Sequence, residues 1–308
     1  MKKKILPFLI ALAALVPQAS AWGGGLILGS ESYLSFGVLG GPGGLMFNGS
    51  VKEPSSMGFT FGFNVNYTCY INNYIGFSTG VHINRMSSGY YESDVLSYGT
   101  GNVQVGDGST LWTVNARYHL KTGRVDETYK TYFVEVPVLL AMQYRKWYWN
   151  MGLKVAVPVA MHADYTYDKS DLYLDEVLGS GTVLSNPLHV NSYDGASGEV
   201  DLYDKQRHQL LMFYVMASAE IGYNVAFYGG ASSLSVGVFM DMSVNSAKLN
   251  NAANTASITL NTNELYYHNS VQTDKVKSVG CFKAGIKLQY NLGIGQGARR
   301  STRGLRYL

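Results

Sequence analysis

Apolar and polar side chains alternate strictly along several stretches of this chain, most clearly over residues 58–70. Phe61 and Phe63 belong to one series of positions, whereas Asn64 and Asn66 belong to the intervening series. A period of two places successive side chains on opposite faces of a β-strand. One apolar and one polar face are typical of strands in transmembrane β-barrels, where the apolar face meets lipid. The pattern therefore predicts a membrane-spanning strand.

Similar stretches recur along the chain, and no segment has convincing helical periodicity. The predicted strands cover 32–47, 58–70, 74–90, 132–144, 147–167, 208–227, 233–247 and 275–293. We therefore predict an all-β fold, an eight-stranded antiparallel up-and-down transmembrane β-barrel with long extracellular loops. Polar strands near 110–119 either extend a loop hairpin above the membrane or raise the strand count to ten.

The connections between predicted strands alternate between short and long. Short turns lie at 72–73, 145–146 and 228–230. Long polar connections cover about 41–57, which overlaps the end of the first predicted strand, and about 91–131, 168–207 and 248–274. Outer-membrane barrels have short periplasmic turns and long extracellular loops. The alternation therefore predicts a bacterial outer-membrane protein with both mature termini in the periplasm.

The N-terminus has the layout of a secretory signal. Met1 is followed by three lysines, an apolar run over 5–16 and the small residues of 19–21. This predicts a cleaved signal peptide over 1–21, an outer-membrane barrel over 22–293 and a basic periplasmic tail over 294–308. Beyond the signal, no stretch approaches the ~20 apolar residues of a membrane-spanning helix.

Composition agrees with this fold class. The chain is 13% aromatic and 15% charged, with 24 tyrosines and 35 glycines. Aromatic girdles and glycine-rich turns are normal for outer-membrane barrels. The formal charge of +3 equals the contribution of the three signal lysines. The mature protein is therefore near neutral, and nothing indicates nucleic acid as a partner.

The two cysteines are predicted to be free thiols. Cys69 lies on the apolar face of its strand, whereas Cys281 alternates with Lys283 and Lys287 on a polar face. Opposite faces of different strands cannot bring two sulfur atoms together without distortion.

Three segments resemble OmpA/PorT-like outer-membrane β-barrel domains. Residues 132–144, Tyr-Phe-Val-Glu-Val-Pro-Val-Leu-Leu-Ala-Met-Gln-Tyr, are similar to the family's aromatic-x-x-Glu-Ile-Pro-Leu-Leu strand. Residues 151–158 resemble the following strand, with its Gly-x-Lys-x-x-x-Pro pattern, and 217–223 resemble a later one. The resemblance spans about 30–293. It implies a porin-like barrel without the C-terminal peptidoglycan-binding domain of many OmpA-type members.

Six charged side chains are expected to point into the lumen by strand parity. They are Glu135, Lys154, Glu220, Asp241, Lys283 and Lys287. An eight-stranded barrel is just wide enough for side chains to fill it, and charges held away from water need partners. We predict a paired lumen network, which either plugs the barrel or forms the constriction of a small pore.

A second candidate group is an aromatic belt at the periplasmic interface. Its residues crowd the short-turn end of the predicted strands, where an interfacial belt should lie. They are Tyr70, Tyr74, Tyr144, Trp147, Tyr148 and Trp149.

The sequence contains no catalytic motif such as G-x-S-x-G beside a histidine, H-E-x-x-H or a P-loop. We therefore expect no enzyme, no catalytic residues, no metal and no cofactor. The expected function is a non-enzymatic outer-membrane protein for envelope structure or surface interaction through its extracellular loops. The alternatives are a narrow porin-like diffusion pore and an accessory barrel of a protein-secretion system. Expected partners are outer-membrane lipid, the barrel-assembly machinery, and an unknown extracellular ligand or periplasmic partner.

Overall fold

The computed structural model describes most of the predicted barrel. The described residues are 31–49, 56–72, 74–106, 111–179, 182–202, 213–226, 232–248, 257–261 and 264–294. The predicted signal peptide, 1–21, and residues 295–308 of the predicted tail lie outside them. No helix in the described part of the chain is long and apolar enough to cross a membrane.

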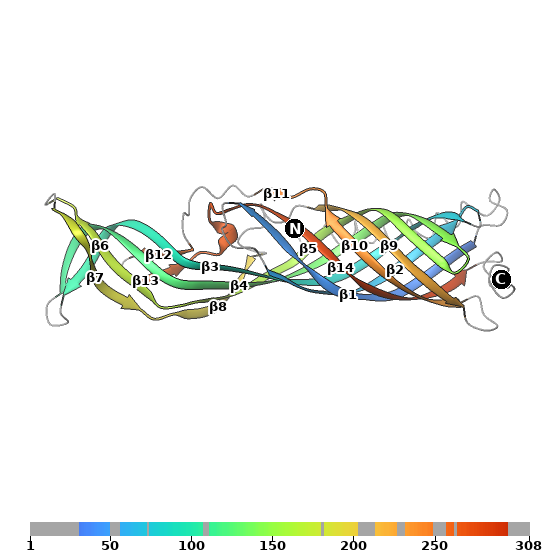
Figure 1. The fold of residues 1–308 in the computed structure, drawn as a ribbon, viewed down its shortest axis with the longest axis horizontal. Helices are drawn as coiled ribbons and strands as arrows, with labels where there is room; N and C mark the ends of the chain where they lie inside the picture. Colours follow the sequence, from blue (N-terminus) through green and yellow to red (C-terminus); the bar gives the residue numbers. More distant parts are fainter. Residues whose placement is uncertain are drawn as a thin grey trace, which may run out of the picture.

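Eight strands form a closed antiparallel barrel (Figure 1). They are β1 (Glu31–Gly49), β2 (Ser56–Tyr70), β3 (Ile75–Gly106), β4 (Leu111–Tyr144), β5 (Trp147–Tyr167), β9 (Tyr214–Ala226), β10 (Ser232–Ser243) and β14 (Val276–Ile294). Each strand pairs with the next in this order, and β14 pairs with β1 to close the ring. The predicted eight-stranded barrel is therefore confirmed.

The outer surface of the barrel is a continuous apolar band. Alternate positions of every strand expose large apolar side chains, while the intervening side chains point inward and are buried. The exposed series includes Phe36, Val38, Phe61, Phe63, Ile75, Phe77, Val138, Leu153, Val155, Ile221, Val225, Val236, Val238, Ile286 and Leu288. A closed sheet satisfies all its backbone hydrogen bonds internally, so this band suits a hydrocarbon environment.

The first predicted long connection, 41–57, is wrong in its first half. β1 continues to Gly49 and β2 begins at Ser56, and 50–55 lie outside the described residues. A Cβ at Gly41 would lie only 2.2 Å from the carbonyl oxygen of Ala284. Glycine therefore permits the close approach of β1 to β14. Residues 41–49 consequently form a strand despite their turn-like composition.

The second predicted long connection, 91–131, is also strand wherever the structure describes it, over 91–106 and 111–131. β3 and β4 keep one unbroken register from Ile75–Met142 to Gly106–Leu111. At ~3.3 Å per residue, a strand of this length is about 100 Å long, far more than the ~25 Å apolar band of such barrels. The segment near 110–119 thus belongs to an extended hairpin and adds no strand to the barrel.

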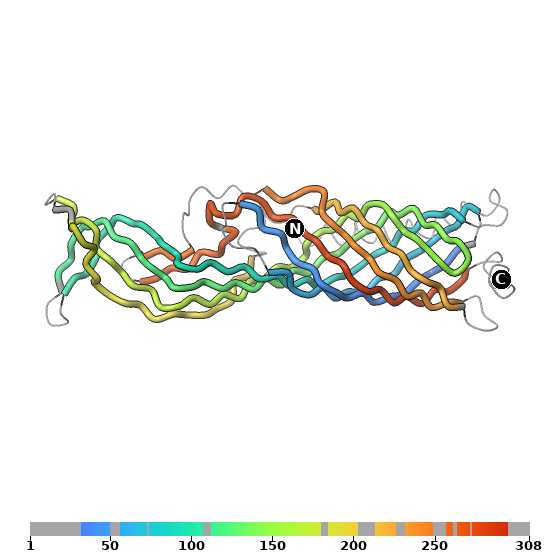
Figure 2. The backbone as a smooth tube through the Cα atoms, viewed as in Figure 1, coloured from blue at the N-terminus to red at the C-terminus, as the bar shows by residue number. Residues whose placement is uncertain are grey.

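Further strands widen this hairpin into a sheet beyond the barrel, which we call the extension (Figures 1 and 2). β6 (Ser170–Val177) pairs with β4, and β7 (Thr182–Tyr193) pairs with β6. The remaining elements are β8 (Ala196–Asp201) on β5, β11 (Ala247–Lys248) on β14, the hairpin β12 (Ile258–Asn261)–β13 (Glu264–Tyr267), and the 3-10 helix η1 (Ser270–Gln272).

The extension has its own apolar core. One face of the sheet buries Val103, Ala116, Leu120 and Leu172, and the β12–β13 hairpin packs on it through Leu260 and Leu265. Tyr118 anchors this hairpin by donating a hydrogen bond to the Leu260 carbonyl oxygen at 3.1 Å. The extension is therefore an ordered sheet and not a collection of independent loops.

Candidate functional site

The six charged side chains predicted for the lumen all lie in it. Each comes from an inward position of β4, β5, β9, β10 or β14, and none is more than 6% exposed. The inward position follows from alternation with the outward apolar series. Lys154, for example, lies between the exposed Leu153 and Val155.

Four of these side chains form one cluster. Lys154 Nζ lies 2.8 Å from Asp241 Oδ2, and Lys283 Nζ lies 3.4 Å from the same oxygen. Lys283 also donates a hydrogen bond to Glu135. The imidazole of His82 lies beside Glu135, with 3.8 Å between Nδ1 and Oε2. Asp241 therefore holds two lysines that would otherwise repel each other in a buried site.

The other two charges form a separate pair nearer the short-turn end. Lys287 Nζ lies 2.9 Å from Glu220 Oε2, and Tyr148 Oη donates a hydrogen bond to Glu220 Oε1 at 2.8 Å. The predicted network contained the charges but left out His82, and Tyr148 was assigned to the aromatic belt instead. Strand parity could have found both, because each follows the same alternation.

An apolar layer covers the charged cluster on the side of the long connections. Its inward side chains include Met86, Phe133, Met216 and Cys281, which meet Glu135 and Lys283 around a cavity of only about 10 Å³. This cavity has room for about one water, so the layer is tightly packed at this level. Cys281 packs here with its Sγ 3.6 Å from Met216 Sδ, whereas Cys69 lies half-buried on β2. Both thiols are free.

The helix η1 packs against this layer from the side of the long connections. Val271 of η1 packs into the apolar layer, and Ser270 N donates to Glu127 Oε1 at 2.8 Å. Tyr129 and Tyr267 also donate to the Glu127 carboxyl group, each at 2.5 Å. Burial raises the pKa of Glu127 above its ordinary value, and these hydrogen bonds partly oppose the rise.

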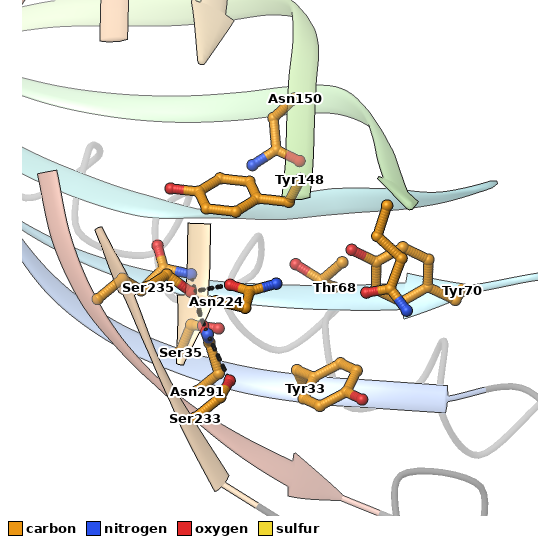
Figure 3. A pocket seen from close by; sticks show the side chains of 12 residues that line it. Tyr33, Ser35, Thr68, Tyr70, Tyr148, Asn150, Asn224, Ser233, Ser235 and Asn291 are labelled. Carbon is orange, nitrogen blue, oxygen red and sulfur yellow. Dashed lines mark hydrogen bonds between the residues drawn. The ribbon is translucent and has the colours of Figure 1, made fainter. Parts of the chain in front are cut away.

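The short-turn end of the lumen is a small neutral vestibule (Figure 3). Its cavity is about 50 Å³. Tyrosines, amides and hydroxyls line it: Tyr33, Ser35, Thr68, Tyr70, Gln143, Tyr148, Asn150, Asn224, Ser233, Ser235, Gln289 and Asn291. The vestibule has room for a few waters, and Tyr148 in its lining donates a hydrogen bond to Glu220 of the first ion pair.

The predicted aromatic belt is partly wrong. Tyr74, Tyr144 and Trp147 are exposed on the outer surface, and Trp149 is partly exposed beside them. Tyr70 and Tyr148 instead point into the vestibule and are buried. The prediction grouped these residues by their height on the strands, whereas their parity puts Tyr70 with inward Thr68, and Tyr148 between outward Trp147 and Trp149.

The open face of the extension carries a row of four rings across four strands. Tyr98 pairs with His119, His119 with Tyr173, and Tyr173 with His189. Neighbouring ring centroids are 5.1–5.9 Å apart. Asp175 fixes the orientation of His119 through a 2.8 Å contact between Oδ1 and Nδ1. These residues fall within the long connections predicted from the sequence, so the row was not predicted.

Known proteins with a similar structure share little sequence with this chain. No protein-family model and no curated protein matches the sequence. Ail, the attachment invasion locus protein of Yersinia pestis, is 11% identical over 85% of this chain and 99% of its own, with a TM-score of 0.29. A FadL homologue of Pseudomonas aeruginosa is 9% identical over 85% of this chain and 89% of its own, with a TM-score of 0.14. The fold assignment therefore rests on the strand pairing itself, and the OmpA/PorT-like resemblance stays a prediction.

Proposed function

We propose that this protein is a non-enzymatic outer-membrane barrel that is closed to solutes and acts through its extension at the cell surface. The observation that supports it is the succession of layers along the lumen. Two groups of ion pairs, an apolar layer and η1 follow one another above a vestibule of about 50 Å³. A barrel filled in this way serves as an anchor, and the part that remains free to interact is the extension.

The orientation belongs to the same proposal. Turns at the vestibule end are short, 71–74 and 145–146, whereas the other end carries the extension. By the usual arrangement of such barrels, the extension is extracellular and both mature termini are periplasmic. Its partners in the envelope are then outer-membrane lipid and the barrel-assembly machinery, with the ligand met by the extension.

A diffusion pore is the competing function, and conductance decides between them. Mature protein, Trp22 to Leu308, is refolded into planar bilayers after a heat-dependent gel shift has verified folding. We expect no discrete openings, because the apolar layer and η1 lie in series with the ion pairs. Reproducible single-channel steps whose size changes in Glu135→Gln or Lys154→Met would make the protein a small porin and overturn the proposal.

Surface exposure of the extension is tested on intact cells. A protease site or epitope inserted between Gly106 and Leu111 should be accessible from outside without permeabilisation. The same insertion at the 145–146 turn is the matched control and should become accessible only after the outer membrane is opened. The reverse pattern would invert the topology and remove the extension from the cell surface.

A further inference from the structure

The four-stranded sheet of the extension, in the order β7-β6-β4-β3, has two edges of different character. The β7 edge is irregular. It contains Pro187, and its pairing with β6 shifts register at two places. Proline and bulges are devices by which natural sheets prevent another strand from adding to an edge.

The β3 edge has none of these devices. Over residues 95–106 it contains no charged residue and no proline, and its register with β4 is unbroken. Pairing of β3 with β2 ends at Gly89. Within the ranges that the structure describes, no strand pairs with the outer edge of 95–106. A long, regular, uncharged edge is a template for another strand, because its outward N–H and C=O groups lack strand partners.

We infer that the outer edge of β3, residues 95–106, receives an extended polypeptide strand of a partner protein in antiparallel pairing. This inference rests on the proposed function, because it needs the extension to stand outside the cell. Backbone hydrogen bonds provide the affinity in this mode, and side chains beside the edge provide the selectivity. An uncharged strand with alternating small and apolar residues fits an edge that offers no charge to pair.

The side chains of β3 present a different surface on each side of such a strand. Tyr98 is 71% exposed and Leu96 is also exposed on the open face. Val105 is half-buried at the border of the apolar core on the covered face. An incoming strand would therefore cover an aromatic ring on one side and continue the core on the other.

A second copy of this chain in the same membrane is a poor occupant. All copies share one orientation, so their β3 strands rise from the barrel in the same direction. Two such edges can meet only in parallel, which is the less stable pairing. A separate extended polypeptide is free to run antiparallel to β3.

The test uses a labelled probe peptide of alternating threonine and valine with serine–glycine flanks, titrated into the mature protein in lipid nanodiscs. The control peptide carries N-methyl groups on consecutive central residues, which blocks both of its edges. We expect saturable binding of the probe only. Hydrogen-exchange mass spectrometry should show slower exchange over 95–106 and no change over 182–193.

Matched variants locate the site on the protein. Thr100→Lys/Asn102→Lys adds two charges on the exposed face of the β3 edge, and Ser185→Lys/Asn186→Lys adds them on β7. We expect the first variant to bind the probe about tenfold or more weakly and the second to match wild type. Equal binding by wild type and the β3 variant, or no saturable binding at all, overturns the inference. The cell-surface and conductance assays read out the proposed function separately, and both variants should pass the heat-dependent gel shift.

Discussion

The ion pair between Lys287 and Glu220 offers the sharpest test of a closed lumen. Both side chains are buried, their charged atoms are 2.9 Å apart, and Tyr148 satisfies the second oxygen of Glu220. Lys287→Met would leave Glu220 as an unpaired charge away from water, and Glu220→Gln would leave Lys287 in the same state. Breaking a buried pair from one side costs about 3–5 kcal/mol, whereas replacing both partners by neutral groups of similar volume is often nearly neutral.

The double variant Lys287→Met/Glu220→Gln therefore distinguishes an ion pair that is shielded from water from one that is hydrated. We expect each single variant to lower the free energy of unfolding by about 3–5 kcal/mol, and the double variant to lose far less than the sum. A loss of 4 kcal/mol is about a thousandfold in the folding equilibrium. Urea titrations in lipid vesicles, followed by tryptophan fluorescence and the heat-dependent gel shift, measure it.

The exposed pair Lys130–Asp164 serves as the control. Its side chains are 36% and 41% exposed, so Lys130→Met should cost less than about 1 kcal/mol. If the Lys287 and Glu220 variants are equally mild, or if their effects simply add, the lumen is hydrated at this level and the reasoning for a closed barrel fails.

Three further predictions concern the cap, the apolar layer and the barrel wall at Gly41, where the cap is η1 with its contacts to Glu127. The raised pKa of Glu127 means that the folded cap binds a proton more readily than the unfolded chain. Its stability should therefore fall as pH rises from the ordinary value of 4.5 through the raised pKa, so proteolysis within 257–275 should increase with pH. Glu127→Gln should flatten that dependence. In a Cys69→Ser background, a water-soluble maleimide should label Cys281, which is 3% exposed, only after unfolding, as mass spectrometry would show. Gly41→Val should lower the free energy of unfolding by about 1–3 kcal/mol in the same urea titration, because its Cβ would clash with the β14 backbone.

Local alternation was enough to predict the barrel from the sequence. Along every barrel strand, successive side chains point alternately to the lipid and to the lumen. Parity alone therefore places Glu135 on β4 and Lys154 on β5 in the interior. The same rule corrects the aromatic belt, since Tyr70 and Tyr148 have inward parity. These features are local because a strand's two faces are decided by neighbouring positions.

The upper half of the lumen could not be predicted in this way. Glu127 meets Ser270 across 143 positions of the chain, and Val271 reaches the apolar layer from a connection without periodicity. Apart from the loop hairpin near 110–119, the extension was hidden for a related reason. Its strands carry mixed polar and aromatic side chains on their open face, a composition shared with loops, and only their pairing with one another reveals a sheet.

The barrel and the extension have separate apolar cores. Surface side chains of the extension can therefore change while the barrel keeps its packing. The apolar layer of the barrel centres on Phe133 and Met216, whereas the extension is held by Leu120 and Leu172 on its own strands. Thr100 and Asn102, on the open face of the β3 edge, belong to neither cluster, and energetic effects of distant, independent sites add with little coupling. The proposed recognition surface can therefore change without endangering membrane insertion, because the side chains that fill the lumen lie below it.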